Sequence, residues 1–265
     1  VDLTVFTTNA NGHNKFLKIP TDHSVTVDGV EVYYFPLTKY VSNIIPFYSQ
    51  KLLHTCFEMM DRFDIIYIVG NWTHPVFAGA SIAINKKIPY VISPRGSLMK
   101  WSMAEKALKK RIYLSLIERR LINHASAIHV SSSLEKTQLN KWNFTPTVYS
   151  IPNGIDINTY ENLPQKGELR TSLGILPSGT LSLFVGRLHK EKRLDLIIQS
   201  FAIVAKQSFD AHLLIVGADQ DGSGKAAIEQ VNKLELNNRV HFAGHLSGLD
   251  LIQAYINADV FILLS

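Results

Sequence analysis

The chain has 265 residues, 46% of them apolar, and its 27 Lys and Arg against 22 Asp and Glu give a net charge of +5. This length and apolar content predict a folded protein with a substantial core. The mild positive charge suits phosphate-bearing ligands or an anionic membrane surface, and no basic stripe interleaved with aromatic residues points to nucleic acid. The single cysteine, Cys56, cannot form an internal disulfide, which fits a reducing compartment. Because no apolar run approaches the ~18 residues of a membrane span, we expect a cytoplasmic protein.

Short β-rich runs alternate with helical patterns along the chain, which predicts a parallel α/β architecture. In the first part, the expected strands lie near 2–8, 31–35, 64–69, 89–93, 127–131 and 147–151. The expected helices there lie near 44–61, 75–86, 104–123 and 133–141.

The helix predicted at 104–123 is strongly basic. Its apolar residues share one face and most of its cations lie elsewhere; they are Ala107, Leu114, Ile117 and Leu121 against Lys106, Lys109, Lys110 and Arg111. This pattern favours a solvated basic face, with peripheral contact to the inner surface of a membrane as the alternative.

A stretch rich in Gly, Pro, Asn and Ser separates this part from a second α/β series. We therefore predict domains at 1–152 and 175–265, joined by a hinge at 153–174. The second domain is expected to contain strands near 180–185, 212–216, 239–243 and 259–264, and helices near 191–206, 223–236 and 248–256.

A basic cluster lies where the strand at 180–185 gives way to the helix at 191–206; it comprises Arg187, His189, Lys190, Lys192 and Arg193. A helix start is already positive, so each further cation there costs roughly 0.3–1 kcal/mol relative to an anion. After Gly186, a guanidinium at Arg187 and an ammonium at Lys192 could converge with free helix N–H groups on a diphosphate. A solvated charged turn is the alternative.

Other candidate sites are weaker. In the loop GADQDGSGK (217–225), Asp219 and Asp221 could hold a divalent cation, but a polar turn capping the next helix is favoured. Ser132-x-x-Glu135 is interpreted as a capping box. His74 and the pair Arg95-Gly96 follow predicted strands, on the side where α/β proteins bind ligands, although a structural role is equally expected.

Together these stretches resemble the GT-B-fold glycosyltransferases of family 4, a retaining group that uses nucleotide-sugar donors. The segments that carry the resemblance are SPRGSLMKW (93–101), IERRLINHASAIHVSSSLE (117–135), IPNGID (151–156), FVGRLHKEKRLDLIIQSF (184–201), LLIVGADQDG (213–222) and NNRVHFAGHLSGLDLIQAYINADVFILLS (237–265). The resemblance implies two Rossmann-like doubly wound parallel-sheet domains that face a cleft, with the acceptor bound mainly by the first and the donor by the second.

Position by position, Arg187 and Lys192 match the basic pair that holds the donor diphosphate in the family, beside Gly186. His245 and Leu246 match the segment that lines the nucleotide base. His74, Arg95 and Gly96 become candidates for the acceptor side of the cleft, although Arg95 stands where many members carry a His that contacts the donor sugar. No metal or other cofactor is implied.

Relative to this family, the chain is expected to be truncated at both ends. A glycine-rich first strand is expected before Val1, and an acidic Glu-x7-Glu loop is expected after Ser265. We therefore expect an incomplete second domain, an inactive fragment, and strands 2–8 and 64–69 that are separated or paired directly because their shared neighbour is absent.

The resemblance implies transfer of a hexose-type sugar from a nucleoside diphosphate to a glycan or lipid-linked oligosaccharide in bacterial surface polysaccharide synthesis. A non-catalytic nucleotide- or sugar-binding module is the alternative. A nicotinamide-dependent oxidoreductase is disfavoured because the chain shows no Gly-x-Gly-x-x-Gly turn.

Overall fold

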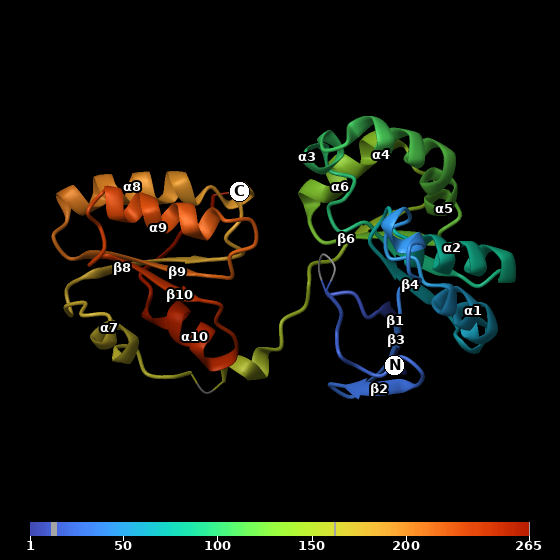
Figure 1. The fold of residues 1–265 in the computed structure, drawn as a ribbon, viewed down its shortest axis with the longest axis horizontal. Coiled ribbons are helices and arrows are strands. Elements are labelled where there is room, and N and C mark those ends of the chain that lie inside the picture. Colours follow the sequence, from blue (N-terminus) through green and yellow to red (C-terminus); the bar gives the residue numbers. More distant parts are fainter. Residues whose placement is uncertain (12–14, 162, 265) are drawn as a thin grey trace. The chain divides into compact units, whose positions relative to one another are not determined.

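The computed structural model describes residues 1–11, 15–161 and 163–264. The chain forms two compact units, Val1–Gly154 and Ile155–Ser265, each with its own hydrophobic core (Figure 1). The division falls inside the segment predicted to be a hinge. None of the helices in the described ranges is long and apolar enough to cross a membrane.

The first unit contains two separate sheets. One has the order β1-β3-β2, and its strands are β1 (Thr4–Thr8), β2 (Ser24–Val27) and β3 (Val30–Phe35). The other is fully parallel in chain order, and its strands are β4 (Ile66–Val69), β5 (Tyr90–Ser93), β6 (Ala127–Val130) and β7 (Val148–Ser150). Since β1 and β4 belong to different sheets in the described part of the chain, the expected separation of these two strands is present.

Strand β2 was not predicted. It pairs with β3 in an antiparallel hairpin whose turn residues, Asp28 and Gly29, have φ angles of 48° and 78°. An Asp-Gly pair between two β-rich runs is a strong hairpin signal because both turn positions need positive φ. The sequence therefore contained the information for β2.

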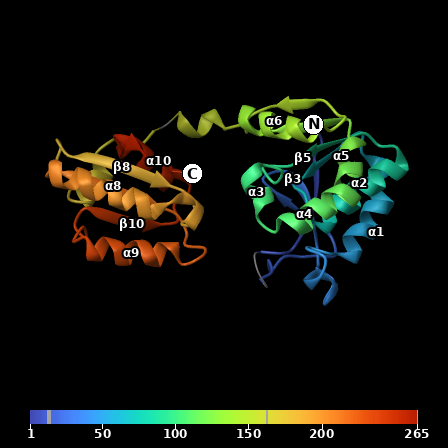
Figure 2. The same ribbon diagram turned by 90° about the horizontal axis from the view of Figure 1, so that it is seen from above.

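The helices of the first unit cover its parallel sheet, and α1 and α2 lie side by side (Figures 1 and 2). They are α1 (Gln50–Met59), α2 (His74–Lys86), α3 (Lys100–Ala104), α4 (Ala107–Tyr113), the π-helical segment η3 (Leu114–Glu118), α5 (Arg119–Asn123) and α6 (Ser133–Leu139). Short 3-10 turns occupy Val41–Asn43, Met60–Arg62 and Asn140–Trp142.

Two helix predictions in this unit need correction. Helix α1 begins at Gln50, not near 44, because Ser49 caps it by accepting a hydrogen bond from Leu52 N (3.2 Å). The helix predicted as continuous over 104–123 is interrupted before α4, where Lys106 adopts a left-handed conformation with φ 52°.

The second unit is a parallel sheet of order β10-β9-β8-β11 with helices on both faces. Its strands are β8 (Thr180–Val185), β9 (Ala211–Val216), β10 (Val240–Gly244) and β11 (Val260–Phe261). Its helices are α7 (Glu168–Ser172), α8 (Leu194–Gln207), α9 (Ser223–Lys233) and α10 (Gly248–Asn257), with 3-10 turns at Ile157–Tyr160 and Lys190–Lys192.

Helices α8 and α9 cover one face of this sheet, and α7 and α10 lie on the other (Figure 1). Helix α7 was not predicted and lies in the segment assigned to the hinge. Strands β9 and β10 are added in turn on one side of β8, and β11 is then added on its other side. The order of strand addition therefore reverses at β8, which makes β8 the topological switch point of the sheet. In open α/β sheets ligands bind beyond the carboxyl ends of the strands at such a switch point. The α/β class and the parallel sheets predicted from the sequence are confirmed.

Candidate donor site and the loops of the first unit

Three glycines bring the ends of β8, β9 and β10 into close backbone contact. Gly186 N donates to Val216 O (3.0 Å), and Gly217 N donates to Gly244 O (2.7 Å). Gly217 has a φ of 153°, and a Cβ atom there would lie 1.8 Å from Gly186 O. Glycine at 217 is therefore required by the close approach of two strand ends, and it sets the position of the loops that follow.

Arg187 follows the end of β8, and the backbone on both sides of it, at Gly186 and Leu188, is hydrogen-bonded to the end of β9 and the segment that follows it. Leu188 is buried behind it, and Leu188 N donates to Ala218 O (2.9 Å). The Arg187 side chain is exposed, and its Nη1 donates to Gln220 Oε1 (3.0 Å). Gln220 is neutral, so the guanidinium is oriented while its charge is retained.

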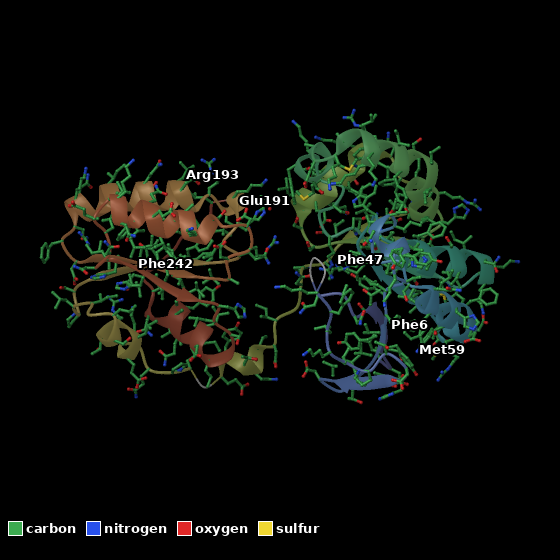
Figure 3. All side chains as sticks on the ribbon, viewed as in Figure 1. Phe6, Phe47, Met59, Glu191, Arg193 and Phe242 are labelled. Carbon is green, nitrogen blue, oxygen red and sulfur yellow. The ribbon has the colours of Figure 1, made fainter. Side chains whose placement is uncertain are left out.

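The rest of the basic cluster occupies a turn that precedes α8. Lys190–Lys192 form a 3-10 turn, and Arg193, with φ 50°, is the N-cap of the helix. The predicted placement of the cations on the first helical turn of 191–206 is therefore wrong by three residues. The left-handed residue Arg193 ends the turn and lets α8 start at Leu194 (Figure 3 shows Glu191 and Arg193 there).

Carboxylates contact some of these cations and not others. Arg193 pairs with Asp195 (Nη2–Oδ2 2.9 Å), and His189 Nε2 lies 3.4 Å from Asp221 Oδ2. Within the described residues, the side chains of Arg187 and Lys192 form no salt bridge. These two predicted diphosphate ligands therefore keep a positive charge that the protein does not pair.

The acidic loop after β9 is the predicted capping turn. Asp219 accepts hydrogen bonds from Gly222 N (3.0 Å) and Lys225 N (3.1 Å) at the start of α9. Asp221 accepts from Ser223 N (3.1 Å) and Lys190 N (3.2 Å), which ties this loop to the basic turn. The hydrogen bonds from Ser223 contribute most to lowering the pKa of Asp221, to about 2, so it is charged at neutral pH.

The two residues predicted to line the nucleotide base follow β10. His245 is exposed, whereas Leu246 is partly buried and packs against the core on the α10 face of the sheet. The structure thus places Gly186 and Arg187 beyond the carboxyl end of β8, and His245 beyond that of β10, with β9 between these two parallel strands.

His74 has a structural environment in the first unit. Its side chain is buried at the start of α2, where Nδ1 accepts a hydrogen bond from Ser49 N (3.4 Å) and the ring centroid lies 4.3 Å from that of Tyr48. Burial lowers the pKa of His74, which favours the neutral ring. His74 connects α2 to the start of α1.

Arg95 has a left-handed backbone conformation, and its side chain contacts Asn153 near the last residue of the first unit. Its φ of 52° lies in the left-handed region, and its guanidinium donates to Asn153 Oδ1 and to Tyr67 OH (3.3 Å). Tyr67 OH lies 2.5 Å from His129 Nδ1, and His129 Nε2 lies 2.8 Å from Ile151 O. This network joins the loop after β5 to the segment that follows β7.

Gly96 is held by a residue to which the sequence analysis gave only a capping role. Glu135 accepts from Gly96 N (2.5 Å) and from Ser131 N (3.1 Å), while Ser132 Oγ accepts from Glu135 N (3.2 Å). The serine cap of α6 is present, but in place of the reciprocal bond that Ser132 N would donate to Glu135, the carboxylate accepts from Ser131 N and Gly96 N. Glu135 therefore fixes the loop that contains Arg95 and Gly96.

Glu118 was missed by the sequence analysis. It is 1% exposed, at the end of the π-helical segment, and accepts from Trp72 N (2.8 Å) and Asn71 Nδ2 (2.9 Å). Trp72 has a φ of 66°, a costly conformation for a large side chain. The sequence signal that could have indicated a buried acid is the position of Glu118 on the same helix face as Leu114 and Leu121.

Replacing Glu118 by Ala is expected to destabilise the first unit by about 2–4 kcal/mol, because the Trp72 N–H and the Asn71 amide would be left buried without an acceptor. The measurement is the free energy of unfolding in urea. Glu105→Ala, at an exposed acid between α3 and α4, is the matched control and is expected to have little effect.

Glu118→Gln tests the charge separately. Burial, opposed by the hydrogen bonds from Trp72 and Asn71, raises the pKa of Glu118 above its ordinary value of 4.5. The folded state therefore holds this proton more tightly than the unfolded chain, and stability is lost as pH rises through the raised pKa. We expect the Glu118→Gln variant to gain stability relative to the wild type over that pH range; parallel pH profiles of the two proteins would contradict the assignment.

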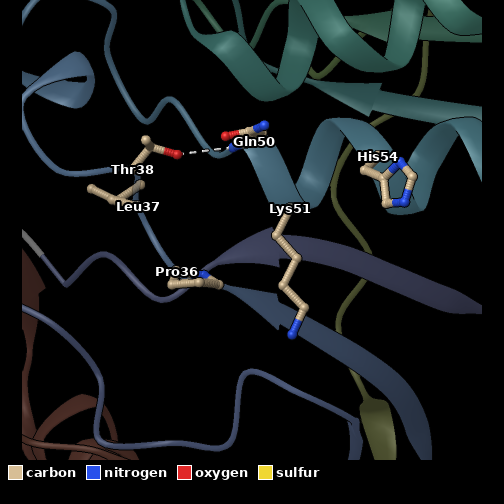
Figure 4. A pocket seen from close by; sticks show the side chains of 6 residues that line it. All are labelled: Pro36, Leu37, Thr38, Gln50, Lys51 and His54. Atoms are coloured by element: carbon tan, nitrogen blue, oxygen red, sulfur yellow. Dashed lines mark hydrogen bonds between the residues drawn. The ribbon is translucent and has the colours of Figure 1, made fainter.

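The first unit also has a hollow away from these loops. A cavity of about 580 Å³ is lined by Pro36, Leu37, Thr38, Gln50, Lys51 and His54 (Figure 4). None of the predicted site residues lines it. Gln50 N donates to Thr38 Oγ1 (3.0 Å) and Lys51 Nζ donates to Thr21 O (2.5 Å), contacts that join α1 to the preceding loops. The residues predicted to bind the donor lie instead at the strand ends of the second unit, where Arg187 and Lys192 have no salt-bridge partner among the described residues and the strand order reverses.

Comparison with known protein families matches both units. Residues 1–154 match the family described as "Glycosyl transferase 4-like domain", and residues 165–265 match that described as "Glycosyl transferases group 1". An uncharacterised glycosyltransferase of Methanocaldococcus jannaschii is 30% identical over 219 residues, which cover 77% of this chain and 52% of the relative. A D-inositol 3-phosphate glycosyltransferase of a Mycobacterium species is 28% identical over 149 residues, covering 54% of this chain and 33% of the relative. The chain thus spans about half, or less, of the length of these relatives.

Solved structures share the fold. HepE of Anabaena in complex with UDP and glucose superimposes with a TM-score of 0.69 at 22% identity, covering 89% of this chain and 61% of HepE. Sucrose-phosphate synthase from Thermosynechococcus elongatus gives a TM-score of 0.69 at 17% identity, covering 98% of this chain and 64% of the synthase. These likenesses confirm the GT-B-like fold implied by the sequence motifs.

Proposed function

Because this chain belongs to the GT-B glycosyltransferases of the family 4 type, we propose that it contributes the donor and acceptor domains of an enzyme that transfers a sugar from a nucleoside diphosphate to a glycan or lipid-linked acceptor. We further propose retention of configuration at the anomeric carbon and a role in bacterial surface polysaccharide synthesis.

One observation carries the proposal. Arg187 extends from the switch point of a parallel sheet, oriented by neutral Gln220, and neither Arg187 nor Lys192 has a carboxylate partner within the described residues. Two unpaired cations beside a helix start are suited to a diphosphate. The structures of HepE with UDP and with UDP-glucose support a nucleotide-sugar as the donor.

The reaction follows from this charge distribution. The bond between the anomeric carbon and the diphosphate oxygen breaks, and the acceptor hydroxyl oxygen forms the new bond to that carbon and passes its proton to the departing diphosphate. Negative charge accumulates on the leaving diphosphate, where Arg187 and Lys192 would stabilise it. Charge placed in advance of the reaction lowers the barrier because little reorganisation is needed.

The test is a calorimetric titration of the protein with UDP, GDP and ADP, each compared with the matching nucleoside. We expect one diphosphate to bind at least a hundredfold more tightly than its nucleoside, since the site recognises the phosphates. Equal binding of the two, or none by any diphosphate, would exclude the proposed donor site.

A second measurement separates an enzyme from a binding module. The matching nucleoside-diphosphate glucose is incubated with the protein, and release of the diphosphate is followed by phosphorus NMR. Release of the diphosphate would identify an enzyme and contradict the expectation of an inactive fragment, whereas tight binding without release over many hours is predicted both by that fragment and by a binding module.

A further inference from the structure

The basic helical segment of the first unit has an apolar stripe on its exposed side. Leu108 is 75% exposed, Ile112 51% and Leu116 74%, whereas Leu114 and Leu121 on the other side are 3% and 4% exposed. The three exposed residues are spaced four apart, so they lie on one side of the helix. A solvated basic face, the arrangement favoured by the sequence, does not require large apolar side chains among the lysines.

Cations surround this stripe. Lys106, Lys109, Arg111 and Arg120 are exposed, and in the described parts of the chain none of them forms a salt bridge. Residues 100–124 contain seven Lys and Arg and two acids, a net charge of +5 that equals the charge of the whole chain. One of the two acids, Glu118, is buried.

Helix α3, which precedes α4 in the chain, also exposes a large apolar side chain close in sequence to a cation. Trp101 on α3 is 59% exposed and precedes Lys106 in the turn between α3 and α4. Figure 1 shows α3 and α4 together at the end of the unit opposite β2. Tryptophan is favoured where an apolar surface meets lipid headgroups.

We propose that α3, α4 and η3 form a docking surface for an anionic lipid bilayer, with Leu108, Ile112 and Leu116 inserted at the headgroup level and the surrounding cations contacting acidic headgroups. An exposed apolar stripe flanked by Lys and Arg binds the interfacial plane through burial of apolar area and charge attraction together. This inference stands on the surface alone and does not depend on sugar transfer.

A second copy of the chain is the main competing occupant. In a two-fold dimer the same surface faces itself, which would bring the unpaired cations of two copies together. Such like-charge contact is unfavourable, whereas an anionic bilayer neutralises the same charges. The charge of the surface therefore favours lipid.

The test is flotation of the whole protein with vesicles of phosphatidylcholine alone or mixed with equal phosphatidylglycerol. We expect binding to the mixed vesicles, weakened by salt, and little binding to the neutral ones. Ile112→Ser with Leu116→Ser is expected to reduce partitioning at least tenfold, and Lys109→Ala with Arg111→Ala to reduce it by a similar factor.

Matched controls separate this surface from general effects. Leu134→Ser removes a residue that is 61% exposed on α6 of the same unit, and Lys206→Ala removes an exposed cation of α8. Both controls are expected to float like the wild type. If the wild type does not bind the mixed vesicles, or if the Ile112/Leu116 variant binds as well as the wild type, the surface does not dock on a membrane. Self-association of the wild type that the same variant abolishes, without flotation, would identify a second copy as the occupant and overturn the proposal.

Discussion

Gly217→Ala is expected to destabilise the second unit by more than about 3 kcal/mol, or to prevent its folding. The added Cβ would lie 1.8 Å from Gly186 O and 3.2 Å from a Leu188 side-chain carbon. The first contact is with backbone at the end of the central strand β8, which cannot move without breaking the bonds from Gly186 N to Val216 O and from Gly217 N to Gly244 O. The expected loss of folding free energy is therefore that of separating the ends of β8, β9 and β10.

The measurement is chemical denaturation, followed by hydrogen exchange to assign the loss to the second unit. Gly222→Ala is the control, because Gly222 lies in the same loop with a φ of 86° but no atom within 4 Å of an added Cβ. It should cost only the ~1–2 kcal/mol of a left-handed alanine. Equal losses in the two variants would mean that backbone strain, and not the contact with Gly186, makes glycine necessary at 217.

The positions of the residues proposed for the donor site could be predicted because their signal is local. The apolar run of β8 followed by Gly186 and Arg187 places an arginine at a strand end, and charge at a helix start is visible in the sequence. The exact helix start was not predictable, because it depends on the left-handed conformation of Arg193 and on the bond from Lys190 N to Asp221.

The roles of residues in the first unit were harder to predict because they depend on partners distant in sequence. Glu135 reaches Gly96, and Glu118 reaches Trp72, contacts that require the loops after β5 and β4 to be placed in space first. Arg95 was placed correctly after a strand, but its bond to Asn153 crosses from β5 to the end of β7. Helix periodicity alone could indicate that position 118 faces the core, and not what an acid binds there.

Arg187→Ala is expected to weaken binding of the preferred nucleoside diphosphate by about 10- to 150-fold, the ~1.5–3 kcal/mol of a charge-assisted hydrogen bond. Lys192→Ala should have a similar effect. In both cases stability should change little, because Arg187 is exposed and bonds a neutral amide, and half-buried Lys192 forms no salt bridge among the described residues. The measurement is the dissociation constant by calorimetry at about 0.15 M salt.

Arg193→Ala is the decisive control, since it removes a cation from the same cluster that is already paired with Asp195 (Nη2–Oδ2 2.9 Å). If Arg187 and Lys192 contact the diphosphate, Arg193→Ala should weaken binding much less than either of those variants when measured at about 0.15 M salt, because it removes an exposed, screened charge and no direct contact with the ligand. Equal losses in all three variants would show that only the summed charge of the cluster matters. An unchanged dissociation constant for Arg187→Ala would remove that residue from the donor site, whatever the fold of the domain that carries it.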